Sequence, residues 1–166
     1  MKQIDIKKFT KYTLEVILSE SDKHFTEISE SINKISERSF YLFALYLSLI
    51  TYSFSEIIKE DYKYFILFFG SIISCFILKN NLFPLRKEIK GAKPSDLVIE
   101  YFEKFKNEDL EKEYLATIIE SYNTSIDTNK DLIKKMVNRY SNSFKNLILF
   151  IILFFIFFLY MLIKCN

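Results

Sequence analysis

An apolar block, Phe40–Leu78, constrains the fold of this chain more than any other feature of its sequence. The block is interrupted once, by the polar run Ser55–Asp61. A helix needs roughly 17–25 apolar residues to cross the hydrocarbon core of a bilayer, and each half of the block reaches that minimum once flanking residues are counted. The interruption is short enough to be a loop. We therefore expect a transmembrane hairpin over residues 39–80, with spans at about 40–56 and 62–79.

A separate apolar run at residues 147–164 predicts a third transmembrane helix. Half of the 166 residues are hydrophobic and 27% are charged, and the charges fall almost wholly between the apolar runs. A single soluble core would not separate the two classes so sharply along the chain. The predicted fold class is therefore all-α, an integral membrane protein with three transmembrane helices. The N-terminal arm (1–38) and the middle segment (81–146) are expected to be helical and cytoplasmic.

The distribution of lysine and arginine predicts how the chain crosses the membrane. Seven of these residues lie in the N-terminal arm and thirteen between Lys79 and Lys145, whereas the hairpin loop holds two and the C-terminal tail holds Lys164 alone. Lysine and arginine are enriched in cytoplasmic loops close to the ends of the spans. We expect a multi-pass protein of the cytoplasmic (inner) membrane, with its N-terminus cytoplasmic and its C-terminus extracytoplasmic.

Small residues recur at four-residue spacing in both spans of the hairpin. The pairs are Ala44 with Ser48 and Gly70 with Ser74. Such pairs allow two membrane helices to approach closely. They favour a packed hairpin, and all four residues are candidates for helix packing.

From Leu110 onward no glycine or proline interrupts the chain, and a seven-residue apolar repeat runs through it. Two series offset by four residues give the a/d pattern of a coiled coil, in which Asn129 is a polar position that can fix the register. The pattern predicts one long helix that leads directly into the third span. Whether the repeat pairs within one chain or between copies stays open at this point. The candidate interface positions are Leu115, Ile119, Tyr122, Ile126, Asn129, Ile133, Met136 and Tyr140.

Two further predictions concern the segments that flank the hairpin. In the N-terminal arm, apolar residues recur at helical spacing. Ser19–Asp22 is predicted to be a pause between two helices, the second of which continues without glycine or proline into the first span. After the second span, Pro84 predicts a helix stop and Gly91–Asp96 a linker, and a short helix is expected at Leu97–Phe105.

No motif in the sequence predicts catalysis or a cofactor. The single histidine, His24, lies near Asp22 and Glu27, but a metal site needs three or four convergent ligands and the sequence suggests no others. Two glycines are too few for a glycine-rich phosphate loop, and a net charge of +2 is too small to indicate nucleic acid. The interiors of the spans carry no charge, which disfavours a transport path. We expect no enzyme; the expected partners are the lipid bilayer and further copies of the chain.

The layout of the chain resembles the small transmembrane effectors of bacterial antiphage defence, namely the Pycsar transmembrane effector and the related SLATT-type hairpin proteins. The likeness lies in the polar N-terminal helix with Ser21–His24, the hairpin, and the segment Tyr122–Tyr140 that leads directly into the third span. The resemblance implies abortive infection, in which oligomers impair the inner membrane after a signal. It also implies that the signal is a cyclic nucleotide, and hence nucleotide binding, without assigning residues to that role. The alternative is a non-toxic membrane anchor or assembly subunit whose cytoplasmic helices bind a partner protein.

Overall fold

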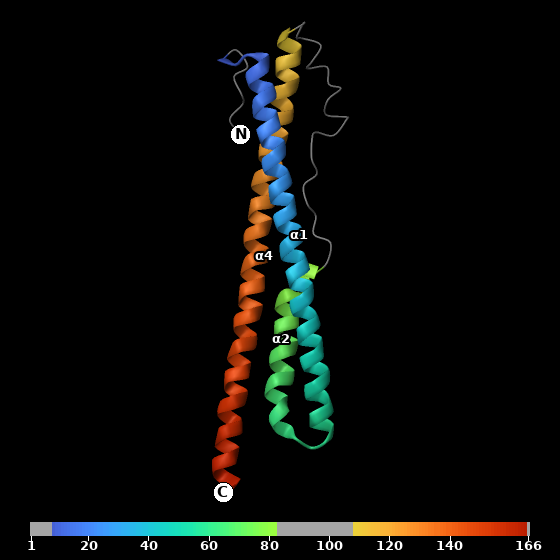
Figure 1. Ribbon diagram of the computed structural model, residues 1–166, viewed down its shortest axis with the longest axis vertical. Coiled ribbons are helices and arrows are strands. Elements are labelled where there is room, and N and C mark those ends of the chain that lie inside the picture. The colour runs from blue at the N-terminus through green and yellow to red at the C-terminus, as the bar shows by residue number, and fades with distance from the viewer. Residues whose placement is uncertain (1–7, 83–107, 166) are drawn as a thin grey trace. The chain divides into compact units, whose positions relative to one another are not determined.

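The computed structural model describes residues 8–82 and 108–165, and every regular element in these two stretches is helical. The predicted all-α class is confirmed for this part of the chain. The predictions for Pro84, for the linker at 91–96 and for a helix at 97–105 lie outside the described residues. The elements are α1 (Lys11–Ile58), the 3-10 helix η2 (Tyr62–Tyr64), α2 (Phe65–Leu82) and α4 (Glu108–Cys165). Figure 1 labels the three α-helices.

Three of the described helical stretches are long and apolar enough to cross a membrane, namely Lys11–Ile58, Tyr62–Leu82 and Glu108–Lys164. Each of the three predicted spans lies within one of them. By length and composition, these helices indicate a multi-pass membrane protein.

The described helices belong to two compact units. The first unit contains α1 up to Ile32 and α4 up to Leu132. The second unit contains α1 from Asn33, all of α2, and α4 from Ile133. Each unit has its own buried core.

Helix α1 is uninterrupted, so the pause predicted at Ser19–Asp22 is wrong. The segment contains neither glycine nor proline, which are the residues that most disfavour a helix interior. It is also supported by a contact across one turn, in which Lys23 Nζ lies 2.6 Å from Glu20 Oε1. The helix begins after Thr10, whose Oγ1 accepts the backbone N–H of Thr13 at 3.1 Å, as an N-cap residue does. One capped helix therefore replaces the two that the sequence predicts.

The turn of the hairpin is shorter than the polar run at 55–61, because the first residues of that run are still helical. The N–H of Glu60 donates to the carbonyl of Ile57 at 3.0 Å, and the N–H of Asp61 donates to the carbonyl of Glu56 at 3.2 Å. This pair of bonds forms a Schellman motif, which satisfies the last carbonyls of a helix. Glu60 has a φ of 67°, in the left-handed region that glycine usually occupies at this position.

In the first unit, α1 and α4 lie side by side and run in the same direction (Figure 1). Lys11 pairs with Glu111 at 2.6 Å, and further along both helices Tyr122 bonds to Asp22. Because both helices are amphipathic, their apolar faces meet and form the core. The buried apolar residues of this unit are Leu14, Phe25, Ile28, Ile32, Ala116, Ile119, Tyr122 and Ile126.

In the second unit, α2 runs antiparallel to both α1 and α4. Asn81 near the end of α2 contacts Ser39 of α1, whereas Tyr64, just before α2, packs on Tyr52 of α1 and on Phe154 of α4. The turn of the hairpin and the C-terminal part of α4 therefore lie at the same end of this unit. Its buried apolar cluster consists of Leu42, Tyr46, Leu78 and Leu147.

Candidate functional site

The seven-residue repeat of α4 faces the interior of the chain. In the first unit its positions pack towards α1, and in the second unit Met136 is buried and Tyr140 packs against the buried cluster. Within the described residues, the repeat therefore packs against segments of the same chain. Its buried members are Ile119, Tyr122, Ile126, Asn129 and Met136, and its half-buried members are Leu115, Ile133 and Tyr140.

Tyr122 makes the most specific contact of the repeat within the first unit. Its ring meets Phe25 edge-on, with the ring centroids 5.7 Å apart. Its hydroxyl donates a hydrogen bond to Asp22 Oδ1 at 2.9 Å. Burial raises the pKa of Tyr122 to about 12, and the hydrogen bond to the Asp22 carboxylate acts in the same direction. The contact therefore favours the neutral phenol and fixes the register of the two helices.

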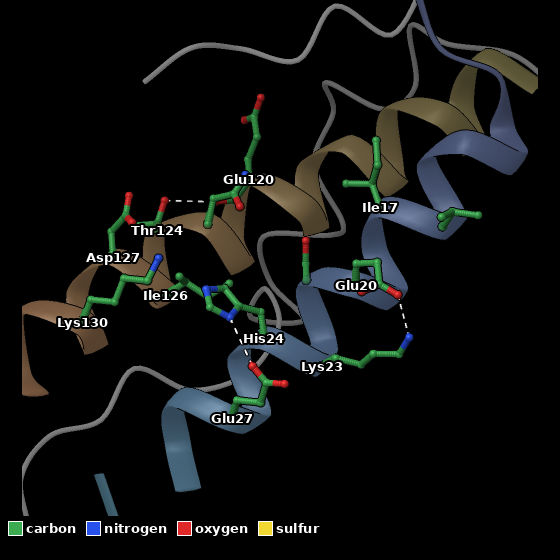
Figure 2. Close-up of a pocket in the computed structure, with 13 residues that line it drawn as sticks. Ile17, Glu20, Lys23, His24, Glu27, Glu120, Thr124, Ile126, Asp127 and Lys130 are labelled. Atoms are coloured by element: carbon green, nitrogen blue, oxygen red, sulfur yellow. Dashed lines mark hydrogen bonds and ion pairs between the residues drawn. The ribbon is translucent and has the colours of Figure 1, made fainter. Parts of the chain in front are cut away.

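Beside this contact, the first unit has an open groove of about 870 Å³ between α1 and α4 (Figure 2). Val16, Ile17 and Ile126 supply its apolar lining. Figure 2 shows that the remaining side chains reach it from both helices. The polar lining residues are Glu20, Ser21, Lys23, His24, Glu27, Glu120, Asn123, Thr124, Asp127 and Lys130.

The charges of this groove are mostly acidic. Four carboxylates line it, against two lysines and one histidine. Two of the carboxylates lie close to a basic side chain of α1. Lys23 Nζ is 2.6 Å from Glu20 Oε1, and His24 Nδ1 is 3.6 Å from Glu27 Oε2. Among the described residues, no group of three or more His, Cys, Asp or Glu side chains is arranged to hold a metal ion. The groove offers a ligand carboxylates, ammonium groups and hydroxyls around an apolar lining.

The two small-residue pairs of the hairpin have different environments. Gly70 and Ser74 are buried against α4, where Asn146 Nδ2 donates to the carbonyl of Gly70 at 3.3 Å and to Ser74 Oγ at 3.0 Å. Ala44 and Ser48 are exposed, and the Ser48 hydroxyl donates to the carbonyl of Ala44 at 3.0 Å. The two pairs therefore do not share one contact, because Gly70 and Ser74 pack on α4 whereas Ala44 and Ser48 face outward.

Buried polar residues in the second unit are a feature that the sequence does not predict. Ser143 Oγ lies 2.8 Å from both Tyr46 Oη and the carbonyl of Ser74. Ser143 has one hydroxyl proton, so when it donates to the carbonyl, the Tyr46 phenol can supply the proton of the other bond. Such bonds hold helices together in an apolar medium, with an average of about 0.6 kcal/mol each in membrane proteins. The one sequence signal for Ser143 is its position, because it is a polar residue seven residues after Met136 in the apolar repeat.

A second polar contact lies nearer the end of α2. Asn81 Nδ2 donates to Ser39 Oγ at 3.3 Å and to the carbonyl of Met136 at 2.9 Å, and the backbone carbonyl of Asn81 accepts from Ser36 Oγ at 3.2 Å. One asparagine thus joins all three helical segments of the second unit. In the sequence, Asn81 lies close to the helix stop predicted at Pro84 and gives no sign of a contact with α4. That contact joins residues 55 positions apart, so it could not be predicted from the sequence.

Comparison with known proteins gives no family for this chain. No family model matches the sequence, and neither curated proteins nor solved structures match it.

Proposed function

We propose that this chain is a membrane-integral effector of a bacterial antiphage (abortive infection) system, which self-associates and impairs the inner membrane on activation. The observation that carries the proposal is the set of three helices of membrane-crossing length, of which the third is the most apolar and the least buried. Only 6% of its most apolar window is buried within the chain. Its side chains are therefore available to lipid or to other copies. The resemblance in layout to the Pycsar and SLATT-type effectors supplies the biological context.

The proposed topology has the N-terminus in the cytoplasm and the C-terminus outside. The lysine and arginine counts of the connecting segments support it. The arrangement of the second unit is compatible with it, because the hairpin turn and the C-terminal part of α4 share one end. At that end Lys63 Nζ lies 5.1 Å from the centre of the Phe158 ring.

Self-association in this proposal uses the exposed face of α1 at Ala44 and Ser48. The other surfaces that the sequence favours for oligomerisation, the repeat of α4 and the Gly70–Ser74 face, are occupied within the chain. Ala44 and Ser48 remain exposed and small, so a second copy can approach α1 closely there.

The activating signal in this proposal enters through the groove of the first unit. Its volume of about 870 Å³ falls within the range of roughly 300–1,000 Å³ that is typical of ligand pockets. The charges favour a cationic ligand or a basic protein segment over a cyclic nucleotide, because four carboxylates face two lysines. The cyclic nucleotide implied by the resemblance therefore has no support from this groove.

Induced expression in bacteria tests the proposal. We expect the wild-type chain, in the presence of its signal, to depolarise cells, as measured with a potential-sensitive dye. The wild-type chain should also form higher oligomers in detergent, and the double variant Ala44→Leu/Ser48→Leu should abolish both these oligomers and the depolarisation. Ala44→Ser/Ser48→Ala, which exchanges the two small residues without adding bulk, is the matched control and should behave like the wild type. Normal growth and membrane potential at high expression, with and without phage infection, would contradict the proposal.

The alternative function is a non-toxic membrane anchor or assembly subunit. The observation that favours it is the acidic groove of the first unit, whose shape and charge suit a basic segment of a partner protein. Under this alternative, one stoichiometric partner co-purifies with the wild-type chain. The charge reversal Asp127→Lys should weaken its capture, and expression of the chain should leave the membrane potential unchanged.

A further inference from the structure

The second unit contains a groove of about 420 Å³ at the turn of the hairpin. One wall is the turn itself and the other is the C-terminal part of α4. The wall on α4 is apolar, whereas the turn contributes charged groups. The lining residues are Glu60, Asp61, Tyr62, Lys63, Phe157, Phe158, Met161 and Leu162.

The ammonium group of Lys63 is held in a defined place in this groove. Its Nζ lies 2.8 Å from Asp61 Oδ2, 5.1 Å from the centre of the Phe158 ring and 5.6 Å from that of Tyr64. A cation within about 6 Å of an aromatic face is attracted to it. The Lys63 side chain remains 27% exposed, so its ammonium group can still bind a further anion.

The charges of the groove select the kind of partner. Glu60 and Asp61 are two carboxylates against the single ammonium of Lys63. A partner with only negative charge would meet this excess of carboxylates. A partner that carries both signs fits better, with its anion at Lys63 and its cation at the carboxylates. A primary ammonium can donate hydrogen bonds to those carboxylates, whereas a quaternary ammonium has no proton to donate.

The position of the groove identifies the partner as a lipid. The turn joins two helices of membrane-crossing length, so it lies at a boundary between hydrocarbon and water once those helices are inserted. Phe157, Met161 and Leu162 continue from the groove along the apolar surface of α4. An acyl chain can follow these side chains while its headgroup stays at the turn.

We propose that this groove binds a phospholipid whose headgroup is zwitterionic and carries a primary ammonium, the class of phosphatidylethanolamine. The phosphate lies at Lys63, the ammonium at Glu60 and Asp61, and one acyl chain lies along Phe157 and Met161. The proposal rests on the membrane insertion contained in the proposed function and is independent of toxicity.

Lipid retention by the purified chain tests this proposal. The full chain is purified in detergent, mixed with equal amounts of phosphatidylethanolamine, phosphatidylcholine and phosphatidylglycerol, and examined by native mass spectrometry. We expect about fivefold more phosphatidylethanolamine than either other lipid, the preference that an exposed ion pair at the upper end of its usual strength gives. Glu60→Gln/Asp61→Asn should lower its retention to that of phosphatidylcholine.

The matched control removes another ion pair of the same turn. Glu56→Gln/Lys59→Gln deletes the contact of 2.8 Å between Lys59 and Glu56, neither of which lines the groove, and should leave the lipid preference unchanged. Helical content by circular dichroism and a single elution peak establish that each variant is folded.

Three results would overturn the proposal: equal retention of the three lipids, preferential retention of phosphatidylglycerol, or an equal loss in the control variant. Carbonate extraction of cell membranes distinguishes failure of the lipid proposal from failure of the proposed function. A chain that is released into the soluble fraction contradicts both proposals. A chain that stays in the membrane without lipid preference contradicts only the lipid site.

Discussion

At the scale of single residues, the partner in space decides what a side chain does. The sequence predicts that Asp22 belongs to a pause between two helices, but it lies inside α1 and accepts a hydrogen bond from the Tyr122 hydroxyl. Glu60 belongs to a polar run that predicts a loop, yet it occupies the left-handed position of a Schellman motif. The hydrogen-bonding capacity of both residues is visible in the sequence. The geometry that uses it depends on atoms that other segments supply.

The bond between Tyr122 and Asp22 gives a prediction for high pH. The folded chain favours the neutral phenol, so this stabilisation is complete below the ordinary tyrosine pKa of 10.0 and is lost as the pH rises through about 12. Tyr122→Phe should lower the free energy of unfolding by about 1.5–3 kcal/mol at pH 8, the value of a hydrogen bond to a charged group. The difference from the wild type should shrink towards pH 12. Thermal melts in detergent followed by circular dichroism measure both effects.

Tyr12 provides the control for this prediction, because it is an exposed tyrosine of the same unit. Tyr12→Phe should leave stability unchanged at every pH between 8 and 12. A stability difference between wild type and Tyr122→Phe that is constant over this range would show that the hydroxyl acts through packing rather than through its ionisation.

At the scale of elements, the long helices follow from the sequence, whereas the partner helix that each face contacts does not. An uninterrupted stretch without glycine or proline predicts α4 as one helix into the third span, and the structure confirms it. The seven-residue repeat gives the buried face of α4 correctly. Of the two small-residue pairs, Gly70–Ser74 packs on α4 and Ala44–Ser48 stays exposed, because spacing identifies places where a helix can approach but not which helix does so.

The contact of Gly70 with α4 gives a prediction for packing. A Cβ at Gly70 would overlap the side chain of Phe150, close to its attachment to the backbone. Gly70→Val should therefore force α2 and α4 apart and lower the free energy of unfolding by about 1–3 kcal/mol, the usual range for overpacking. Ala44→Val, at an exposed small residue of α1, is the matched control and should unfold at the wild-type temperature. Equal melting temperatures for Gly70→Val and the wild type would contradict the close packing of α2 and α4.

At the scale of the whole molecule, the three membrane-length helices limit the possible topologies, and the lysine and arginine counts favour the proposed one. In the second unit, the hairpin turn and the C-terminal part of α4 lie at the same end. If the turn is outside, the C-terminal part of α4 is outside as well, so the two termini cannot both be cytoplasmic. The buried polar contacts of Asn81 and Ser143 tie the helical segments of this unit to one another.

Chemical labelling in intact cells tests the topology. In a variant whose cysteines are replaced by alanine, Lys59→Cys at the turn and Lys130→Cys in the first unit introduce exposed thiols, one on each predicted side. A membrane-impermeant maleimide should label Lys59→Cys in intact cells and Lys130→Cys only after permeabilisation, because lysine-rich and arginine-rich segments stay in the cytoplasm. The reverse pattern would contradict the proposed orientation, and labelling of both sites in intact cells would contradict a sealed inner membrane between them.

The sequence by itself determines that the described part of this chain is helical, that three of its helices have the length and composition to cross a membrane, and which face of α4 is buried. These properties are local, because hydrophobicity and its period depend only on residues that are close along the chain. Only the tertiary structure decides that this face packs within one chain, that Gly70 meets Phe150, and that Ala44 and Ser48 remain exposed. Apolar faces attract one another without direction, so the sequence pattern alone cannot specify which two of them meet.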